Sequence, residues 1–243
     1  MVDIHCHILP GVDDGAETMQ EALEMARIAA DCGVTDLAVT PHFRGDALEV
    51  QRMEALNSRF RELETALRQA EIPLMLHLGA EILCTWDTPD LAQAGLLPTM
   101  GDTLYVLCEF RFDAPYSYMD EILGDIQEAG YWPVVAHPER YGCIQQEPRR
   151  VQRWFRKGYV IQLNKGSILG SFGLRPMETA MQLLDWGTVH VIASDAHSSD
   201  RRSTDMRYLL GWLMERYPRG YIRLLLTDNP GRLLRGEDMA PIC

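Results

Sequence analysis

The sequence predicts a single α/β domain, residues 1–243, built as a closed parallel barrel. Short β-branched segments alternate with longer amphipathic segments along the whole chain, and this alternation is typical of parallel strands connected by helices. About seven such units fit the length, which suits a closed barrel better than an open doubly wound sheet, the alternative architecture. No internal repeat, low-complexity segment or linker divides the chain.

Seven short apolar segments are expected to be strands: 2–5, 36–40, 74–81, 104–109, 133–137, 160–163 and 189–194. Six amphipathic segments between them are expected to be helices: 18–31, 47–70, 118–129, 148–156, 176–185 and 204–215. Thr18 and Glu21 have the spacing of a capping box, and Gly33 is expected to end the first helix. Thr227-Asp228-Asn229-Pro230 predicts a cap before a last short helix.

Composition and charge exclude several classes of protein. The formal net charge is −12 and no Lys/Arg-rich run is present, so nucleic acid is not expected as a partner. No apolar run approaches the roughly 18–20 residues that a membrane span needs, and no signal peptide is visible. The six cysteines show no C-x-x-C spacing, which favours reduced thiols. We therefore expect a cytoplasmic protein with no membrane insertion.

The first strand carries the strongest functional signal. His5 and His7 are two residues apart, so a strand projects both imidazoles from the same face, where they can bind one metal ion. Other histidines and carboxylates follow the remaining strands: His42, Glu81, Glu109, His137, Asp195 and His197. Because the carboxyl ends of barrel strands converge, these eight side chains are expected to form one ring. Such mixed ligation suits Mn, Fe or Zn rather than Ca or Mg alone.

The two other histidines are expected to be structural. His77 shares the face of Glu81 but lies four residues earlier, about 13 Å down the strand at roughly 3.3 Å per residue. His190 lies near the opposite end of its strand from Asp195.

With these residues placed, the chain resembles the polymerase and histidinol phosphatase (PHP) superfamily. Within it, the chain is similar to the bacterial manganese-dependent protein-tyrosine phosphatases of capsule and exopolysaccharide clusters. The resemblance rests on five stretches that span nearly the whole chain in order: residues 3–15, Thr40-Pro41-His42, Gly79-Ala80-Glu81, Ala136-His137-Pro138-Glu139-Arg140-Tyr141 and Ser194-Asp195-Ala196-His197.

The resemblance implies a distorted (β/α)7 TIM-like barrel that holds three divalent metal ions, with Mn²⁺ as the expected metal and Fe or Zn as alternatives. It implies nine metal ligands: His5, His7, Asp14, His42, Glu81, Glu109, His137, Asp195 and His197. Eight of them are the strand-end residues named above. The ninth is Asp14, and the adjacent Asp13 is the alternative for that position. It also implies that Arg140 and Arg202 hold phosphate. Arg201 is the rival of Arg202, and Ser203 departs from the Arg-Pro often found in the family.

The activity implied by the resemblance is hydrolysis of phosphotyrosine on proteins, with the tail of a membrane-associated tyrosine kinase as the expected substrate. A metal ion supplies hydroxide near neutral pH, and arginine forks hold the phosphoryl oxygens. Histidinol-phosphate or other small-molecule phosphatases, nuclease-like phosphodiesterases and a catalytically silent metal-binding module are the alternatives. The net negative charge disfavours a nuclease-like phosphodiesterase. The presence of every expected ligand and both arginines disfavours a catalytically silent module.

A second phosphatase pattern is also present and is disfavoured. Cys143 and Arg149 match the C-x5-R motif of thiol-dependent tyrosine phosphatases. A phosphate-binding loop needs successive backbone N–H donors. The five inner residues contain no glycine, Pro148 has no N–H, and Glu147 would repel phosphate.

Further roles are expected around the site. Asp3 is a candidate partner for a ligating histidine. Five residues after the second and fourth strands are candidates for the rim of the site: Phe43, Arg44, Phe110, Arg111 and Phe112.

Overall fold

In the part of the chain that the structure describes, all strand pairs are parallel and form two sheets. The computed structural model describes residues 1–44 and 53–241. The first sheet has the order β1 (Val2–Cys6), β2 (Asp36–Val39), β4 (Met75–Leu78). The second has the order β3 (His42–Phe43), β5 (Glu81–Leu83), β6 (Tyr105–Glu109), β7 (Trp132–Ala136), β8 (Val160–Asn164), β9 (Val191–Ala193).

The two sheets together form a distorted barrel with seven strand positions. β2 continues into β3 after two residues, and β4 continues into β5 after two, so each pair occupies one position. An isolated bridge between Cys6 and Ala196 joins β1 to the chain just after β9. Two backbone bonds support this closure, from His7 N to Ala196 O at 2.8 Å and from Asp195 N to His5 O at 2.9 Å. The expected (β/α)7 barrel is confirmed.

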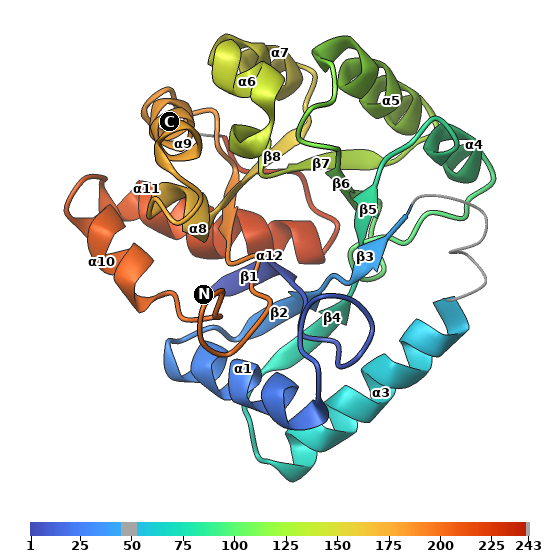
Figure 1. The fold of residues 1–243 in the computed structure, drawn as a ribbon, viewed down its shortest axis with the longest axis vertical. Coiled ribbons are helices and arrows are strands. Elements are labelled where there is room, and N and C mark those ends of the chain that lie inside the picture. The colour runs from blue at the N-terminus through green and yellow to red at the C-terminus, as the bar shows by residue number, and fades with distance from the viewer. Residues whose placement is uncertain (45–52, 242–243) are drawn as a thin grey trace.

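Helices surround the barrel (Figure 1). The longer ones are α1 (Met19–Asp31), α3 (Met53–Gln69), α5 (Tyr116–Glu128), α9 (Leu174–Asp185) and α10 (Arg207–Met214). The shorter ones are α4 (Thr88–Gln93), η1 (Pro138–Arg140), α6 (Gly142–Gln146), η2 (Pro148–Arg150), α7 (Val151–Arg156), α8 (Lys165–Ile168), α11 (Arg219–Arg223), η3 (Leu224–Asp228) and α12 (Asn229–Leu234). Across residues 1–44 and 53–241, no helix combines the length and apolarity of a bilayer span.

Alternation along the strands separates two apolar layers. One set of strand residues packs in the barrel interior and includes Ile4, Ala38, Leu107, Val134 and Val191. Sequence neighbours of the last four, such as Leu37, Val106, Val135 and Ile192, belong to the larger layer beneath the helices. This is the pattern expected of strands buried on both faces.

The ends of the first helix agree with the sequence prediction. Thr18 caps α1, because its Oγ1 accepts a bond from the backbone N–H of Glu21 at 3.2 Å. The Glu21 carboxylate accepts from the N–H of Glu17, one residue before the cap. Gly33 follows the helix with φ of 89°, a conformation that favours glycine.

Three expectations for the secondary structure are wrong in detail. The segment 74–81 is two strands, because β4 pairs with β2 in one sheet whereas β5 pairs with β3 and β6 in the other. The segment Thr227–Pro230 does not cap a helix, since η3 runs directly into α12 and Asp228 makes no capping bond. The helices α4, α6, α8 and α11 were not expected, because each is too short to show a clear period. The expected helix start at 47 lies outside the described residues.

Candidate metal centre

Glu81 lies at the centre of a cluster of histidines at the carboxyl ends of the strands. Its Oε1 is 3.2 Å from His5 Nε2 and 2.8 Å from His137 Nε2. Its Oε2 is 3.3 Å from His7 Nε2 and 3.1 Å from His42 Nδ1. Glu81 and three of these histidines are almost fully buried, whereas the His42 side chain is 38% exposed. One carboxylate therefore reaches four imidazoles from three different strand ends, because His5 and His7 both lie at the end of β1.

Three groups of side chains in the described residues have the spacing to hold a metal ion. Within each group, one nitrogen or oxygen atom from every member lies within 4.8 Å of the others. The groups are His7, Asp14, His42, His197; His5, His7, Glu81; and His42, Glu81, Glu109. His7, His42 and Glu81 each belong to two groups, so the three positions adjoin. Imidazole nitrogens and carboxylate oxygens together form a donor set that fits Mn, Fe or Zn.

His137 and Asp195 border these groups and share an unusual backbone. His137 has φ of 34° and Asp195 has φ of 50°, and each follows the last residues of a strand. Left-handed backbone is unfavourable for such residues and often accompanies a functional site. Asp195 Oδ1 lies 3.4 Å from His5 Nε2 and 3.6 Å from His7 Nε2. His137 also reaches Glu109, at 3.7 Å.

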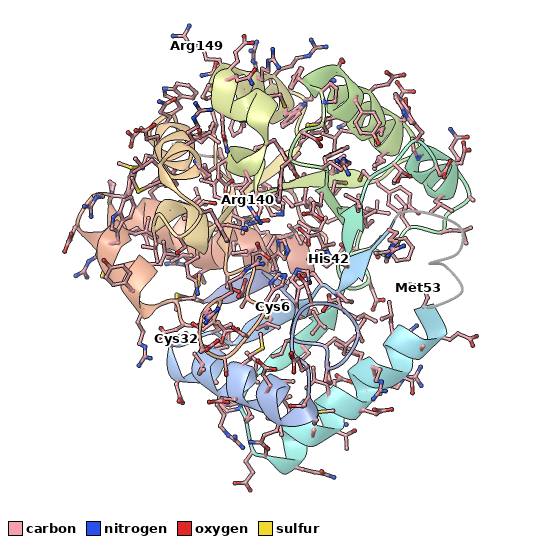
Figure 2. The ribbon with its side chains drawn as sticks, viewed as in Figure 1. Cys6, Cys32, His42, Met53, Arg140 and Arg149 are labelled. Atoms are coloured by element: carbon pink, nitrogen blue, oxygen red, sulfur yellow. The ribbon has the colours of Figure 1, made fainter. Side chains whose placement is uncertain are left out.

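Two arginines contact the other oxygen of Asp195. Arg202 Nη2 lies 2.6 Å from Asp195 Oδ2, and Arg140 Nη1 lies 3.4 Å from the same atom. Arg201, the rival of Arg202, is exposed, and its backbone N–H donates to Asp200. Figure 2 shows Arg140 and His42 near the middle of the molecule. Two guanidinium groups thus lie beside the candidate metal positions.

The charges in the cluster shift its pKa values strongly. Burial lowers the pKa of His5, but the charges of Glu81 and Asp195 outweigh burial and raise it to about 9. Burial likewise opposes the rise of the His7 pKa to about 10, which hydrogen bonds to Asp13 and Glu81 cause. Burial raises the pKa of Glu81, yet the surrounding histidines hold it well below its usual range. The negative charge around His5 and His7 thus favours a positive charge at this position, which a divalent ion would supply in place of protons.

A family comparison agrees with this geometry. Residues 1–235 match the model of the family described as capsular polysaccharide synthesis, CpsB/CapC. The chain belongs to the CpsB/CapC family.

Named relatives of this family cover almost the whole chain. It is 34% identical over 238 residues to the tyrosine-protein phosphatase YwqE of Bacillus subtilis, covering 98% of this chain and 92% of YwqE. It is 28% identical over 242 residues to the tyrosine-protein phosphatase CpsB of Streptococcus pneumoniae, covering 98% of this chain and 99% of CpsB.

Solved structures support the same assignment. One crystal structure from the work on YwqE and CpsB, which are described as metal-dependent tyrosine phosphatases, superposes with a TM-score of 0.86 at 32% identity. It covers 99% of this chain and 96% of that chain. A phosphotriesterase homology protein from Escherichia coli superposes with a TM-score of 0.62 at 10% identity, covering 96% of this chain and 97% of that one. This second likeness shows the barrel fold alone.

The two adjacent carboxylates of the CpsB/CapC chain, Asp13 and Asp14, face different partners. Asp14 Oδ1 lies 3.2 Å from His42 Nε2 and 3.5 Å from His197 Nε2, inside a candidate metal group. Asp13 Oδ2 lies 2.9 Å from His7 Nδ1 and accepts from the His42 N–H at 2.9 Å. The geometry therefore favours Asp14 as the ligand, with Asp13 orienting His7 from behind.

A β-bulge in β1 turns His5 toward the site. The register advances from Asp3 to Cys6 while the partner strand advances only from Leu37 to Val39, so β1 has one extra residue. Asp3 Oδ1 accepts from the N–H of His5 at 3.3 Å and from the N–H of Ser194 at 3.0 Å. Asp3 thus contacts the backbone of His5 rather than its ring, and its role is to hold the bulge against β9.

Two polar residues on β8 were not expected at the site. Gln162 Oε1 lies 3.0 Å from His5 Nδ1, and Gln162 Nε2 donates to Asn164 Oδ1 at 2.9 Å. Asn164 Nδ2 in turn donates to Asp195 Oδ2. A donor hydrogen on His5 Nδ1 leaves Nε2 free to bind metal, so this chain of bonds orients His5. The signal was visible, because both polar residues alternate with apolar ones in a buried strand.

The remaining sequence candidates lie away from the metal groups or pack in the loops. His77 pairs with Asp36, with its Nε2 3.1 Å from Oδ1. His190 is buried, and its Nδ1 accepts from the N–H of Ile161 at 3.0 Å. Cys143 packs 3.8 Å from the sulfur of Met119.

The expected rim is only partly present. Phe43 and Phe110 are buried, and Arg111 pairs with Asp113. Arg44 is exposed. Phe112 is 44% exposed and contacts Arg140, so it is the aromatic residue of this set that borders the site.

Proposed function

We propose that this chain is a metal-dependent protein-tyrosine phosphatase and that its nine clustered side chains hold three divalent ions. The observation that supports this most directly is the set of three adjoining metal-binding groups beside two arginines. The names of its relatives YwqE and CpsB agree with this activity. The proposed ligands are His5, His7, Asp14, His42, Glu81, Glu109, His137, Asp195 and His197.

We propose Mn²⁺ as the metal in the cell, with Fe or Zn as alternatives. Bound divalent ions neutralise phosphoryl oxygens and make water acidic enough to act as a nucleophile near neutral pH. The protein's own contribution is to fix the ligands. Asp13 and Gln162 hold the far nitrogens of His7 and His5, so that each ring presents Nε2 to the site.

Arg140 and Arg202 are proposed to hold the phosphoryl oxygens that do not contact metal. Both lie at one side of the cluster and reach Asp195. A guanidinium offers paired N–H donors whose geometry matches two phosphate oxygens. Phe112 lies beside Arg140 and is half exposed, so it can border the phenyl ring of a phosphotyrosine.

The proposed substrate is phosphotyrosine in a protein segment, namely the tail of a membrane-associated tyrosine kinase, in the control of capsular or exopolysaccharide synthesis. The family description supports the link to polysaccharide. The proposed location is the cytoplasm. The described cysteines, Cys6, Cys32, Cys84, Cys108 and Cys143, are free thiols, as in a reducing compartment.

The deciding assay removes all metal and then compares substrates. Metal-free protein should be inactive, and Mn²⁺ should restore activity. With Mn²⁺, kcat/KM for a phosphotyrosine peptide should exceed that for a phosphoserine peptide and for histidinol phosphate by at least about tenfold, or roughly 1.4 kcal/mol. Preference for histidinol phosphate would favour the small-molecule phosphatase, and full turnover without metal would overturn the metal mechanism.

The arginine roles have a matched test. Arg140→Ala and Arg202→Ala should each lower kcat/KM by about ten- to a hundredfold, because a charge-assisted hydrogen bond contributes roughly 1.5–3 kcal/mol. Both variants should keep their full metal content by elemental analysis. Arg201→Ala is the control, since Arg201 is exposed and adjacent in sequence. Damage by Arg201→Ala and not by Arg202→Ala would move the role to Arg201.

A further inference from the structure

Both phosphate-facing arginines contact the same aromatic ring. The guanidinium carbon of Arg140 lies 4.3 Å from the centre of the Phe172 ring, and that of Arg202 lies 5.6 Å from it. Phe112 contacts Arg140 as well, with its ring centre at 4.4 Å. Phe172 is half buried, in the segment between α8 and α9. No motif in the sequence pointed to it.

A glycine on α8 makes room for this ring. A Cβ at Gly166 would lie 2.7 Å from Cε2 and 3.1 Å from Cζ of Phe172. The backbone of Gly166 does not adopt the left-handed conformation that favours glycine. The absence of a side chain is therefore needed for space rather than for backbone geometry. Any larger residue would push the ring from its place beside the two arginines.

The two arginines need something besides Asp195 to hold them. They carry like charges, and both approach a single carboxylate oxygen, Asp195 Oδ2. That oxygen also accepts from Asn164. Arginine side chains are long and flexible, so each loses rotamer freedom when it is fixed. An aromatic face attracts a guanidinium without neutralising it, which leaves its N–H donors available to a phosphate.

We propose that Phe172 is a positioning residue that sets the spacing of Arg140 and Arg202 for phosphate, and that Gly166 is small in order to admit it. This inference rests on the proposed function, because it assumes that the two arginines hold phosphate. The proposal extends the site to Gly166 on α8 and to Phe172 in the loop that follows it. Phe172 acts through the arginines and not on the metal groups.

The test measures phosphate affinity directly. Calorimetric titration of the manganese-loaded protein with inorganic phosphate should give a Kd about three- to tenfold weaker for Phe172→Ala and Phe172→Leu, with metal content unchanged. Phe172→Tyr keeps the ring and should restore affinity to within about twofold. Leu174→Ala is the control, because Leu174 is nearby in sequence and 70% exposed. If Phe172→Leu binds phosphate normally, the aromatic ring has no such role.

Gly166→Ala tests the same contact without removing the ring. It should weaken phosphate binding in the wild-type background and have little effect in Phe172→Ala. Because Gly166→Ala and Phe172→Leu are milder changes, they keep the proposal testable if Phe172→Ala fails to fold. Additive effects of the Gly166 and Phe172 substitutions would overturn it.

Further measurements distinguish an error in the role of Phe172 from an error in the roles of the two arginines. In an Arg140→Ala background, the effect of Phe172→Ala should shrink, because only the longer contact with Arg202 remains; an undiminished effect overturns the proposal. Loss of kcat/KM for phosphotyrosine peptide alone, with phosphate affinity intact, would show that the ring stacks on substrate instead. Unchanged phosphate affinity in Arg140→Ala and Arg202→Ala would refute the arginine roles themselves.

Discussion

Nδ1 of His7 lies 2.9 Å from Oδ2 of Asp13, on the side of the imidazole away from Glu81. The same carboxylate oxygen accepts from the N–H of His42. Asp13 thus joins the loop after β1 to two strand ends, while Asp14 beside it points toward His42 and His197. Two neighbouring carboxylates that look equivalent in sequence therefore have different expected roles.

The first prediction separates those roles. Asp14→Ala should lose close to one equivalent of metal, because it removes a ligand of the most exposed group. Asp13→Ala should keep full stoichiometry at saturating Mn²⁺ but bind about ten- to a hundredfold more weakly, as expected for a residue that orients a ligand. Elemental analysis and calorimetric titration measure the two effects. The opposite pattern would exchange the assignments.

The second prediction concerns Asp3 and the bulge in β1. Asp3→Ala leaves the buried N–H groups of His5 and Ser194 without their acceptor, so the free energy of unfolding should fall by about 1–3 kcal/mol. Asp3→Asn keeps an oxygen at the Oδ1 position and should recover most of the loss. Urea denaturation of both metal-loaded variants measures this difference. Equal losses in the two variants would argue against the backbone role.

The third prediction is a pH effect on stability from His190. Burial lowers the pKa of His190 to about 4. Between pH 6.5 and 4, His190 is protonated in the unfolded chain but stays neutral in the folded one. The free energy of unfolding therefore decreases as the pH falls from 6.5 toward 4. The slope from this residue approaches about 1.4 kcal/mol per pH unit.

His190→Asn removes this titration and keeps an acceptor for the N–H of Ile161. Its unfolding free energy, from urea curves between pH 6.5 and 4.5, should fall less steeply than that of the wild type. His77→Asn is the control, because His77 is partly exposed and pairs with Asp36. Parallel curves for His190→Asn and wild type would refute the assignment.

The fourth prediction concerns the thiol motif. Cys143→Ser should retain at least about half of the wild-type kcat/KM, because the Cys143 sulfur faces Met119 and burial raises the pKa of its thiol. Figure 2 shows Arg149 at the outer edge of the molecule, away from Arg140 and His42. Steady-state assay with phosphotyrosine peptide is the measurement. Loss of activity with metals and fold intact would favour thiol chemistry.

The barrel and the cluster at the strand ends can be predicted from the sequence because both follow from its periodicity. Alternation of strands and helices locates each strand end, and parallel strands bring those ends together. The position of His5, Glu81 and Asp195 at strand ends is therefore enough to predict that they lie near each other. Their roles as metal ligands remain predictions.

Loop geometry was harder to predict, since loops have no period. Whether Asp13 or Asp14 turns inward depends on the bend before Gly15, where the chain passes so close to His7 that a Cβ would lie 1.9 Å from its carbonyl oxygen. Phe172 reaches the arginines from a loop, through contacts that no spacing encodes. The break between β4 and β5 likewise depends on tertiary structure, because the two strands pair in different sheets.

The bridge between Cys6 and Ala196 has a consequence for synthesis of the protein. His5 and His7 leave the ribosome first, yet Asp195 and His197 follow some 190 residues later, which takes on the order of ten seconds or more at about 5–20 residues per second. Throughout that interval the nascent chain exposes imidazoles that lack their final partners. The barrel therefore closes around His5 and His7 only after β9 and Asp195 have emerged, so assembly of this candidate site is a late step in the folding of the nascent chain.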